Sequence, residues 1–214
     1  MTLAFIGIGN VGFALAHHLQ QKGHQILIAH DGGETSTSVQ KALAQNPHFL
    51  VKPVQQAVTL ADVVLLATPF KANEAILKGV QFQGKMLVDC TNPVGPGFTH
   101  GLKSERSGAE WVQECAPDAR VVKAYSIYGF ENFADATFPA YNVKPVMLIA
   151  GNDAAAKKQV AELNTDLGFE TLDTGALSQA LHLEHMTLLW VKMVRMGGHS
   201  PHFAWASLSK PPAS

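Results

Sequence analysis

The stretch Leu3-Ala-Phe-Ile-Gly-Ile-Gly-Asn-Val-Gly12 decides how the start of this chain folds. The apolar run from Thr2 to Ile6 is typical of a strand that is buried on both faces. The residues from Asn10 to Lys22 have the apolar spacing of a helix, and Gln25 to Ala29 forms a second apolar run. We therefore expect a strand, a glycine-rich turn, a helix and a second strand, in that order.

The glycines of this turn, Gly7, Gly9 and Gly12, form a G-x-G-x-x-G motif between the first strand and the first helix. In a dinucleotide-binding unit the first glycine permits the tight turn, the second lets the backbone approach the pyrophosphate, and the third lets helix and strand pack closely. The N–H groups of the helix N-terminus then face the phosphates. The predicted cofactor-binding residues of the turn are Gly7, Ile8, Gly9, Asn10, Val11 and Gly12.

The rest of the chain continues to alternate strands and helices. Further strands are predicted at 48–51, 63–67, 85–89, 119–124, 146–150 and 169–173, with helical segments between most of them. This alternation, with strands that are apolar throughout, is typical of a parallel sheet with helices on both faces. We predict an α/β fold of the Rossmann type, doubly wound and mostly parallel, as a single NAD(P)-binding domain over residues 1–214.

Two later segments stand out from this alternation. The segment from Tyr125 to Tyr141 is irregular, and we expect a long loop of the kind that is usually functional. A helix from about Ser178 to Met196 is apolar on nearly every side, so we expect it to be buried. One domain is short of surface to cover such a helix, and we predict a homodimer in which Met186 to Met196 contributes to the shared surface.

The composition excludes several classes of protein. Hydrophobic residues make up 47% of the chain and charged residues 15%, with a net charge of −1 and no basic run, so we expect no nucleic-acid partner. The apolar stretch 186–196 contains Lys192 and Arg195 and is too short to span a bilayer. Two cysteines make no disulfide framework, and a strand at residue 2 leaves no room for a signal peptide. We expect a cytoplasmic protein without a membrane partner.

The loops that follow the second, fourth and fifth strands carry the other predicted site residues. The carboxyl ends of parallel strands form the ligand crevice of such a sheet. We therefore expect cofactor contacts from His30 and Asp31, from Thr68-Pro69-Phe70 and from Asn92-Pro93. Strand termination explains Pro69 and Pro93 equally well.

Asp31 bears on the choice of cofactor, because it lies 19 residues after Gly12 at the end of the second strand. An acidic residue there accepts hydrogen bonds from the adenosine ribose and repels a 2′-phosphate, which favours NAD(H). A turn-forming aspartate before Gly32-Gly33 is the simpler alternative. His30 and the hydroxyls of residues 35–38 are still able to receive a phosphate, so NADP(H) also stays open.

Seven segments together resemble a known family. They are Gly7–Gly12, Ala67–Pro69, Asp89–Pro93, Ser104–Glu110, Val121–Tyr125, Gly175–Leu177 and Leu183-Glu184. With them, essentially the whole chain is similar to the NADP-dependent reductases of the deazaflavin coenzyme F-420. Relatives of that family include the cytosolic reductase domain of six-transmembrane ferric reductases. The resemblance implies a homodimer that brings a nicotinamide against a flavin-like ring, without an obligatory side-chain acid or base.

The chain also departs from this family at three places. His30-Asp31 stands where the family commonly has Ser-Arg to hold the 2′-phosphate of NADP. Leu181 stands where relatives often carry an arginine near the acceptor, and Tyr125-Ser126-Ile127 replaces the more usual Phe-Asn-Thr. These departures concern the cofactor preference and the acceptor.

No residue of the sequence stands out as a catalytic acid or base. Lys123 ends a strand, and we interpret it as structural. His182 and His185 share one face of the last helix, but no third ligand lies at a helpful spacing, so we predict no metal site. A flavin-like acceptor can take its proton from solvent, which suits such a site.

The sequence therefore predicts an oxidoreductase that transfers a hydride between a nicotinamide dinucleotide and a small redox acceptor, with a flavin or deazaflavin as the first choice. We expect the acceptor side of the site to be formed by about 125–141 and 175–206. Two alternatives remain. One is an NAD(P)H-dependent reductase of a small carbonyl or imine, and the other is a redox sensor that binds the nucleotide without turnover.

Overall fold

The computed structural model describes residues 1–210, and the last four residues of the predicted domain lie outside the described residues. One sheet of eight strands organises the fold, in the order β3-β2-β1-β4-β5-β6-β7-β8. The strands are β1 (Thr2–Ile6), β2 (Gln25–Ala29), β3 (Leu50–Lys52), β4 (Val63–Leu66), β5 (Met86–Asp89), β6 (Arg120–Lys123), β7 (Val146–Gly151) and β8 (Glu170–Asp173).

Strands β1 to β6 are parallel and follow the order 3-2-1-4-5-6 of a doubly wound dinucleotide-binding fold. Strand β7 runs antiparallel to β6, and β8 runs parallel to β7. The predicted Rossmann-type, mostly parallel sheet is confirmed.

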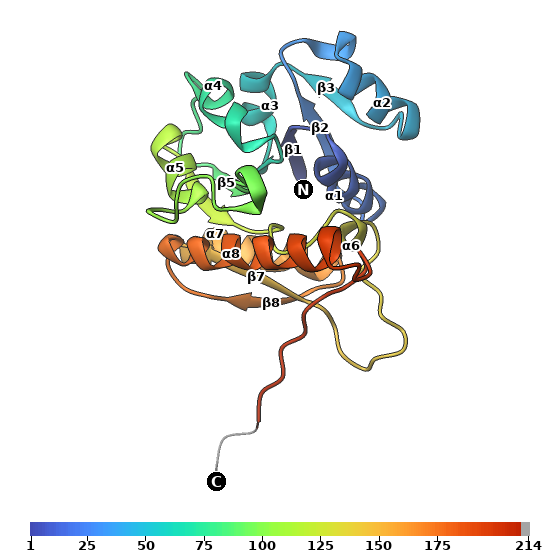
Figure 1. The fold of residues 1–214 in the computed structure, drawn as a ribbon. Helices are drawn as coiled ribbons and strands as arrows, with labels where there is room; N and C mark the ends of the chain where they lie inside the picture. Colours follow the sequence, from blue (N-terminus) through green and yellow to red (C-terminus); the bar gives the residue numbers. More distant parts are fainter. Residues whose placement is uncertain (211–214) are drawn as a thin grey trace.

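Helices cover both faces of the sheet (Figure 1). They are α1 (Asn10–Gln21), α2 (Thr37–Gln45), α3 (Val54–Leu60), α4 (Asn73–Leu77), α5 (Gly108–Cys115), α6 (Glu131–Ala134), α7 (Ala154–Asp166) and α8 (Ala180–Val191). Residues Lys192–Met196 continue α8 in a π-helical turn. The segment 125–141 contains the short helix α6, which sequence periodicity did not indicate because it is only one turn long.

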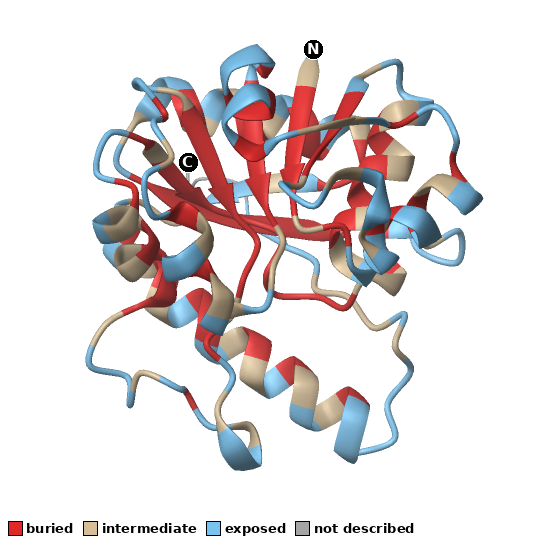
Figure 2. Ribbon diagram, turned by 90° about the horizontal axis from the view of Figure 1, so that it is seen from above, coloured by how far each residue is buried: buried red, intermediate tan, exposed pale blue. Residues whose placement is uncertain are grey.

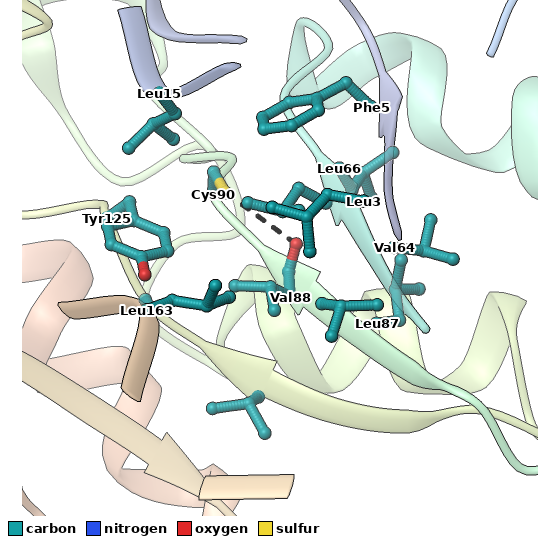
Figure 3. Close-up of a cluster of buried hydrophobic side chains, with 14 of the residues drawn as sticks. Leu3, Phe5, Leu15, Val64, Leu66, Leu87, Val88, Cys90, Tyr125 and Leu163 are labelled. Carbon is teal, nitrogen blue, oxygen red and sulfur yellow. Dashed lines mark hydrogen bonds between the residues drawn. The ribbon is translucent and has the colours of Figure 1, made fainter. Parts of the chain in front are cut away.

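The central strands supply most of the core, as the red ribbons of Figure 2 show. Every residue of β4 and β5 is buried, because both faces of these strands are covered. Figure 3 shows part of this core, where Leu3 and Phe5 of β1 lie in one apolar cluster with Val64 of β4 and Val88 of β5. The unbroken apolar runs of the sequence are explained by this two-sided burial.

Helix α5 begins later than its sequence predicts, at Gly108 rather than at Ser104. Lys103 and Ser104 have φ angles of 54° and 61°, which no right-handed helix allows. Ser107 is the N-cap instead: its hydroxyl oxygen accepts the N–H of Glu110, and the Glu110 carboxylate accepts the N–H of Ser107. This reciprocal capping box fixes where the helix starts.

The single chain covers the C-terminal helix only in part, so the expected burial holds for one face of it. Only one face of α8 is buried, through Leu183, Glu184, Thr187 and Trp190. On the opposite face Leu189 is 49% exposed, and Met196 in the π-helical turn is 66% exposed (α8 lies along the lower edge of Figure 2). Among residues 1–210, no helix has both the length and the apolarity to cross a membrane.

Candidate functional site

A cleft of about 740 Å³ opens at the carboxyl ends of β1, β2 and β4. Strand β1 lies between β2 and β4: the chain passes from β1 outward to β2 and β3, and then crosses back to form β4 on the other side of β1. This is the switch point at which doubly wound sheets bind their ligands. The cleft contains predicted site residues from three loops: Gly7, Ile8, Gly9, His30, Asp31, Thr68 and Pro69.

The structural reason for a glycine is not the same at the three glycine positions of the turn. Gly7 has a φ of +97°, and a Cβ there would lie 2.7 Å from the backbone of Ala67 and Thr68. A Cβ on Gly12 would lie 2.2 Å from the carbonyl oxygen of Gly7, so Gly12 permits helix α1 to pack against the turn. Protein packing therefore requires a glycine at both positions.

Gly9 is the exception, because a Cβ there would meet no protein atom within 4 Å. Its φ of −71° and ψ of −164° are accessible to any residue. Nothing in the protein itself requires a glycine at this position. A ligand that approaches the backbone closely, as a pyrophosphate does, supplies the missing reason, and the turn fits a dinucleotide.

The N-terminus of α1 adds a site for negative charge. This helix has 12 residues, its first turn carries no acidic residue, and no side chain caps it. The first N–H groups of such a helix are free for an anion, which the positive end of the helix dipole also attracts. Asn10 lines an adjoining cleft of about 640 Å³, together with Thr37, Ser38 and Lys41, and this cleft shares Gly9 and Ser38 with the first. Val11 and Gly12 line none of these clefts.

Two side chains after β2 are held in place at the edge of the main cleft. The N–H of Val54, at the start of α3, donates to Asp31 Oδ1 at 2.9 Å. The N–H of Gly32 donates to His30 Nδ1 at 2.9 Å. One carboxylate oxygen of Asp31 thus caps α3, a role that neither interpretation of the sequence predicted, while the side chain lines the main cleft.

The loops after β4 and β5 meet at a second cleft of about 610 Å³, which shares Pro69 with the first. Phe70, Asn92 and Pro93 line it, and Trp111 adds an aromatic wall with the Arg106 guanidinium 4.4 Å from its ring centroid. All thirteen predicted cofactor residues except Val11 and Gly12 thus line one of three adjoining clefts. Which of them contact a cofactor stays a prediction.

Asn92 also ties the second cleft to the C-terminal part of the chain. Its amide nitrogen donates to the carbonyl oxygen of Ser126 at 3.3 Å, and the Thr187 hydroxyl lies 3.0 Å from its amide oxygen. Thr187 belongs to α8, and Ser126 follows β6. The segments that we expect to form the acceptor side therefore reach the loop after β5.

A buried ionic network of Asp89, His100, Lys123 and Glu184 lies beside this contact. Lys123 Nζ is 2.9 Å from Asp89 Oδ2 and 3.2 Å from Glu184 Oε1, and it also donates to the carbonyl oxygen of Thr91. His100 Nε2 donates to Glu184 Oε2 at 2.8 Å. The Glu184 carboxylate further accepts the N–H groups of Gly108 and Ala109, which begin α5.

The charges of this network stabilise one another. Burial by itself lowers the pKa of Lys123, but Asp89 and Glu184 outweigh burial and leave this pKa raised. Burial by itself raises the pKa of Glu184, but Lys123 and the donors from Gly108 and His100 leave it lowered. Lys123 is therefore a buried cation with all its donors engaged, in agreement with its interpretation as structural.

Several residues of the network lie in segments that carried the family resemblance, namely Asp89, Lys123 and Glu184. The sequence analysis identified these segments but did not predict the ion pairs that connect them in the structure. Asn73 was missed altogether: it is fully buried and bonds both Thr68 and Thr91. A single asparagine five residues after Thr68 carries no sequence signal of its own.

The two histidines of α8 have different surroundings. His185 Nε2 lies 2.9 Å from the Ser104 hydroxyl, and His182 is exposed. Among the described residues, no group of three His, Cys, Asp or Glu side chains is arranged to hold a metal ion.

The fold and the cleft define a Rossmann-type dinucleotide-binding protein. Residues 2–93 match the family model described as NADP oxidoreductase, coenzyme F420-dependent. A hypothetical protein, SMa0349 from Sinorhizobium meliloti, is 30% identical, with a TM-score of 0.74 over 84% of this chain and 88% of that one. The chain belongs to the coenzyme F420-dependent NADP oxidoreductase family, as its sequence segments predict.

Two further relatives extend the comparison. A crystal structure from Arthrobacter sp. FB24, described as a candidate F420-dependent NADP-reductase, is 25% identical, with a TM-score of 0.82 over 98% of this chain and 100% of that one. The metalloreductase STEAP3 of Rattus norvegicus is 28% identical over 188 residues, which are 87% of this chain. The chain spans about a third (36%) of the length of that curated relative.

Proposed function

We propose that this protein is an oxidoreductase that transfers a hydride between a nicotinamide dinucleotide and a small redox acceptor, with a flavin or deazaflavin as the acceptor. The observation that carries the proposal is Gly9, which no protein contact requires and which borders an uncapped helix N-terminus. The family description and the candidate reductase from Arthrobacter support the same chemistry. The bound nicotinamide would supply or receive the hydride.

The chain's own residues bind and orient the cofactor in this proposal. The turn from Gly7 to Gly12 and the start of α1 hold the pyrophosphate, and His30 with Asp31 borders the adenosine ribose. Thr68, Pro69 and Phe70 then face the nicotinamide half, because they lie where the first and second clefts adjoin. Asn92 and Pro93 close this end from the loop after β5.

The acceptor side is proposed to be formed by about 125–141 and 175–206, next to the cleft lined by Phe70 and Trp111. The contacts of Asn92 with Ser126 and Thr187 support this location, because they bring both segments to the loop after β5. Aromatic side chains at such a cleft suit a flat ring system, which stacks on them favourably.

Neither Lys123 nor Tyr125 is free to donate a proton, which disfavours them as the acid that reduction of a carbonyl or imine needs. Lys123 is enclosed by Asp89 and Glu184. Tyr125 is buried in the apolar cluster of Figure 3 beside Leu15, Cys90 and Leu163, and burial raises its pKa well above the usual value. Carbonyl reduction needs a poised acid, whereas a flavin-like ring can take its proton from solvent.

For the cofactor we propose a preference for NAD(H) over NADP(H). The Asp31 carboxylate is fixed at the cleft by the N–H of Val54, so it cannot easily turn away from a 2′-phosphate. The family description names NADP, and the hydroxyls of Thr37 and Ser38 with the Lys41 ammonium offer an alternative phosphate contact in the adjoining cleft. The measured preference decides between these two readings.

We also propose that the protein is a homodimer. The exposed face of α8 supports it, because Leu189 and Met196 are large apolar side chains without cover in one chain. An exposed apolar face of this kind commonly marks a protein interface. A second copy would bring its α8 close to the proposed acceptor side.

Steady-state turnover tests the proposed activity. Purified protein is mixed with NADH or NADPH and, in parallel, with FMN, FAD, a deazaflavin, a quinone, a cyclic imine and a ferric chelate. We expect oxidation of the nicotinamide with the flavin or deazaflavin. Turnover with the imine alone would favour the carbonyl and imine alternative. Tight nucleotide binding without turnover of any acceptor would favour a sensor and contradict the proposal.

A further inference from the structure

Thr68 lies at the start of a chain of hydrogen bonds that runs from the main cleft into the protein. Its hydroxyl donates to Asn73 Oδ1 at 2.7 Å. The amide nitrogen of Asn73 donates to Thr91 Oγ1 at 3.0 Å, and the Thr91 hydroxyl donates to Asp89 Oδ1 at 2.7 Å. We call Thr68, Asn73, Thr91 and Asp89 the Thr68 relay.

The direction of every bond in this relay is fixed from its buried end. The Asp89 carboxylate lies 2.9 Å from Lys123 Nζ, and a carboxylate only accepts hydrogen bonds. The Thr91 hydroxyl must therefore give its one proton to Asp89. It can then only accept from Asn73, which turns the amide nitrogen of Asn73 toward Thr91 and its amide oxygen toward Thr68.

This leaves the Thr68 hydroxyl with its proton committed to Asn73. Asn73 and Asp89 are fully buried and Thr91 nearly so, so water does not compete for the bonds between them. Thr68 itself is half-buried and lines the main cleft. A free threonine hydroxyl can donate or accept, whereas this one can only accept from a ligand.

We infer that Thr68 is a specificity-determining residue that selects a hydrogen-bond donor on the nicotinamide riboside half of the cofactor, and that Asn73, Thr91 and Asp89 set this selectivity. The inference rests on the proposed function, which brings that half of the dinucleotide to Thr68. Two groups there carry donors, the carboxamide NH₂ and the ribose hydroxyls. A phosphate or carboxylate oxygen would be rejected at this position, because it offers no proton to Thr68.

Asn73, Thr91 and Asp89 are positioning residues, since none of them lines the cleft. If the relay is cut at Thr91, the Asn73 amide loses the contact that orients it. The Thr68 hydroxyl is then free to donate as well as to accept. Discrimination between ligands should fall, even though the altered residue touches no ligand.

Calorimetric titration with three oxidised dinucleotides tests the inference. The parent is NAD⁺ or NADP⁺, whichever binds better. One analogue is its 3-acetylpyridine form, which has a methyl in place of the amide NH₂, and the other carries a 2′-deoxyribose on the nicotinamide side. In the wild type we expect one analogue to bind about tenfold more weakly than the parent, the size of one lost hydrogen bond.

Four variants complete the experiment. Thr68→Val should bind the parent about as weakly as the wild type binds the discriminated analogue, with little further loss for that analogue. Thr68→Ser keeps the hydroxyl and should restore the discrimination. Thr91→Val should reduce the difference in affinity between the parent and that analogue severalfold. Thr59 is an exposed threonine on α3, and Thr59→Val should leave this difference unchanged. Thermal unfolding shows that each variant is folded before titration.

The outcomes separate this inference from the proposed function. If the wild type binds neither dinucleotide, the proposed function is contradicted. The inference about Thr68 is contradicted, and the proposed function stands, if the wild type binds both analogues as tightly as the parent dinucleotide. The same holds if Thr68→Val binds the parent as tightly as the wild type does and discriminates between the ligands as well. Unchanged discrimination in folded Thr91→Val would contradict the role of the relay.

Discussion

The cleft at the glycine turn and the buried ionic network belong to the same fold, but they differ in whether their polar groups have partners within the protein. At the cleft, the N–H groups that begin α1 have no side-chain cap, and the space above Gly9 holds no protein atom. In the network, Lys123 and Glu184 are 0% and 1% exposed, and each has several partners. Groups without a protein partner indicate where a ligand binds, whereas groups with many partners indicate what holds the fold together.

The largest effect is expected in the network, from Lys123→Met. It leaves the Asp89 and Glu184 carboxylates buried without their cation, and removing one partner of a buried ion pair costs about 3–5 kcal/mol. Urea unfolding measures the loss. The matched control is Lys157→Met, whose partner Asp173 is at the surface, and we expect a loss of about 1 kcal/mol or less there.

The same variant also tests whether Lys123 is structural. A Lys123→Met protein with normal unfolding free energy but no turnover would mean that the lysine is catalytic. The contrast between cleft and network would then be wrong, since a buried and fully paired group would be doing the chemistry.

The next effect concerns the cleft and the charge of Asp31. Two like charges about 4 Å apart cost roughly 4 kcal/mol at an effective dielectric of 20, and salt and bound water reduce this to about tenfold in affinity. We expect the wild type to bind NADH more tightly than NADPH and Asp31→Asn to narrow the difference by about that factor. The asparagine keeps an oxygen for the N–H of Val54, so only the charge changes.

Asp62→Asn is the matched control, because Asp62 is an exposed carboxylate that likewise accepts a backbone N–H, from Thr2. It should leave both dissociation constants unchanged. A wild type that prefers NADPH would show that the cofactor preference of the family persists beside Asp31.

The smallest effect on the folded chain is expected from Leu189→Asp on the exposed face of α8. Within one chain the change removes no buried contact, so the folded chain itself should lose no more than about 0.5 kcal/mol, and any larger fall in the unfolding free energy would reflect the lost dimer contact. Sedimentation should show a dimer for the wild type and a monomer for the variant at micromolar concentration. Leu60→Asp, at a similarly exposed leucine on α3, should remain a dimer. A monomeric wild type would contradict the proposed homodimer.

The sequence predicted those parts of the fold that depend on local patterns. Strands β1 and β2 have the predicted bounds, because buried parallel strands read as unbroken apolar runs, and Gly7 directly follows β1. The start of α5 was missed because the backbone at Lys103 and Ser104 depends on the loop that encloses them. For α8, composition indicated an apolar helix but not which of its faces the rest of the chain covers.

The candidate site likewise contains residues that were predictable from the sequence and residues that were not. The residues of the turn and of the strand ends were predictable, because each motif lies in one short stretch of sequence. The Thr68 relay was not, because it joins β5, α4 and two loops, and only the three-dimensional structure brings Asn73 between Thr68 and Thr91. Contacts between distant segments leave no periodic signal in a single sequence.

The central claim is that the glycine turn binds a nicotinamide dinucleotide, and Gly9→Val tests it most directly. The backbone angles at this position suit any residue and a Cβ there meets no protein atom within 4 Å, so the fold should survive with a cost of about 1 kcal/mol from the poorer helix cap. Gly12→Val, whose Cβ would clash with Gly7, should instead fail to fold.

Calorimetric titration of wild type and folded Gly9→Val with NADH and NADPH is the measurement. We predict binding of at least one dinucleotide to the wild type and loss of that binding in the variant, because the valine side chain would occupy the place of the pyrophosphate. A folded Gly9→Val protein with unchanged affinity for both dinucleotides would contradict the account.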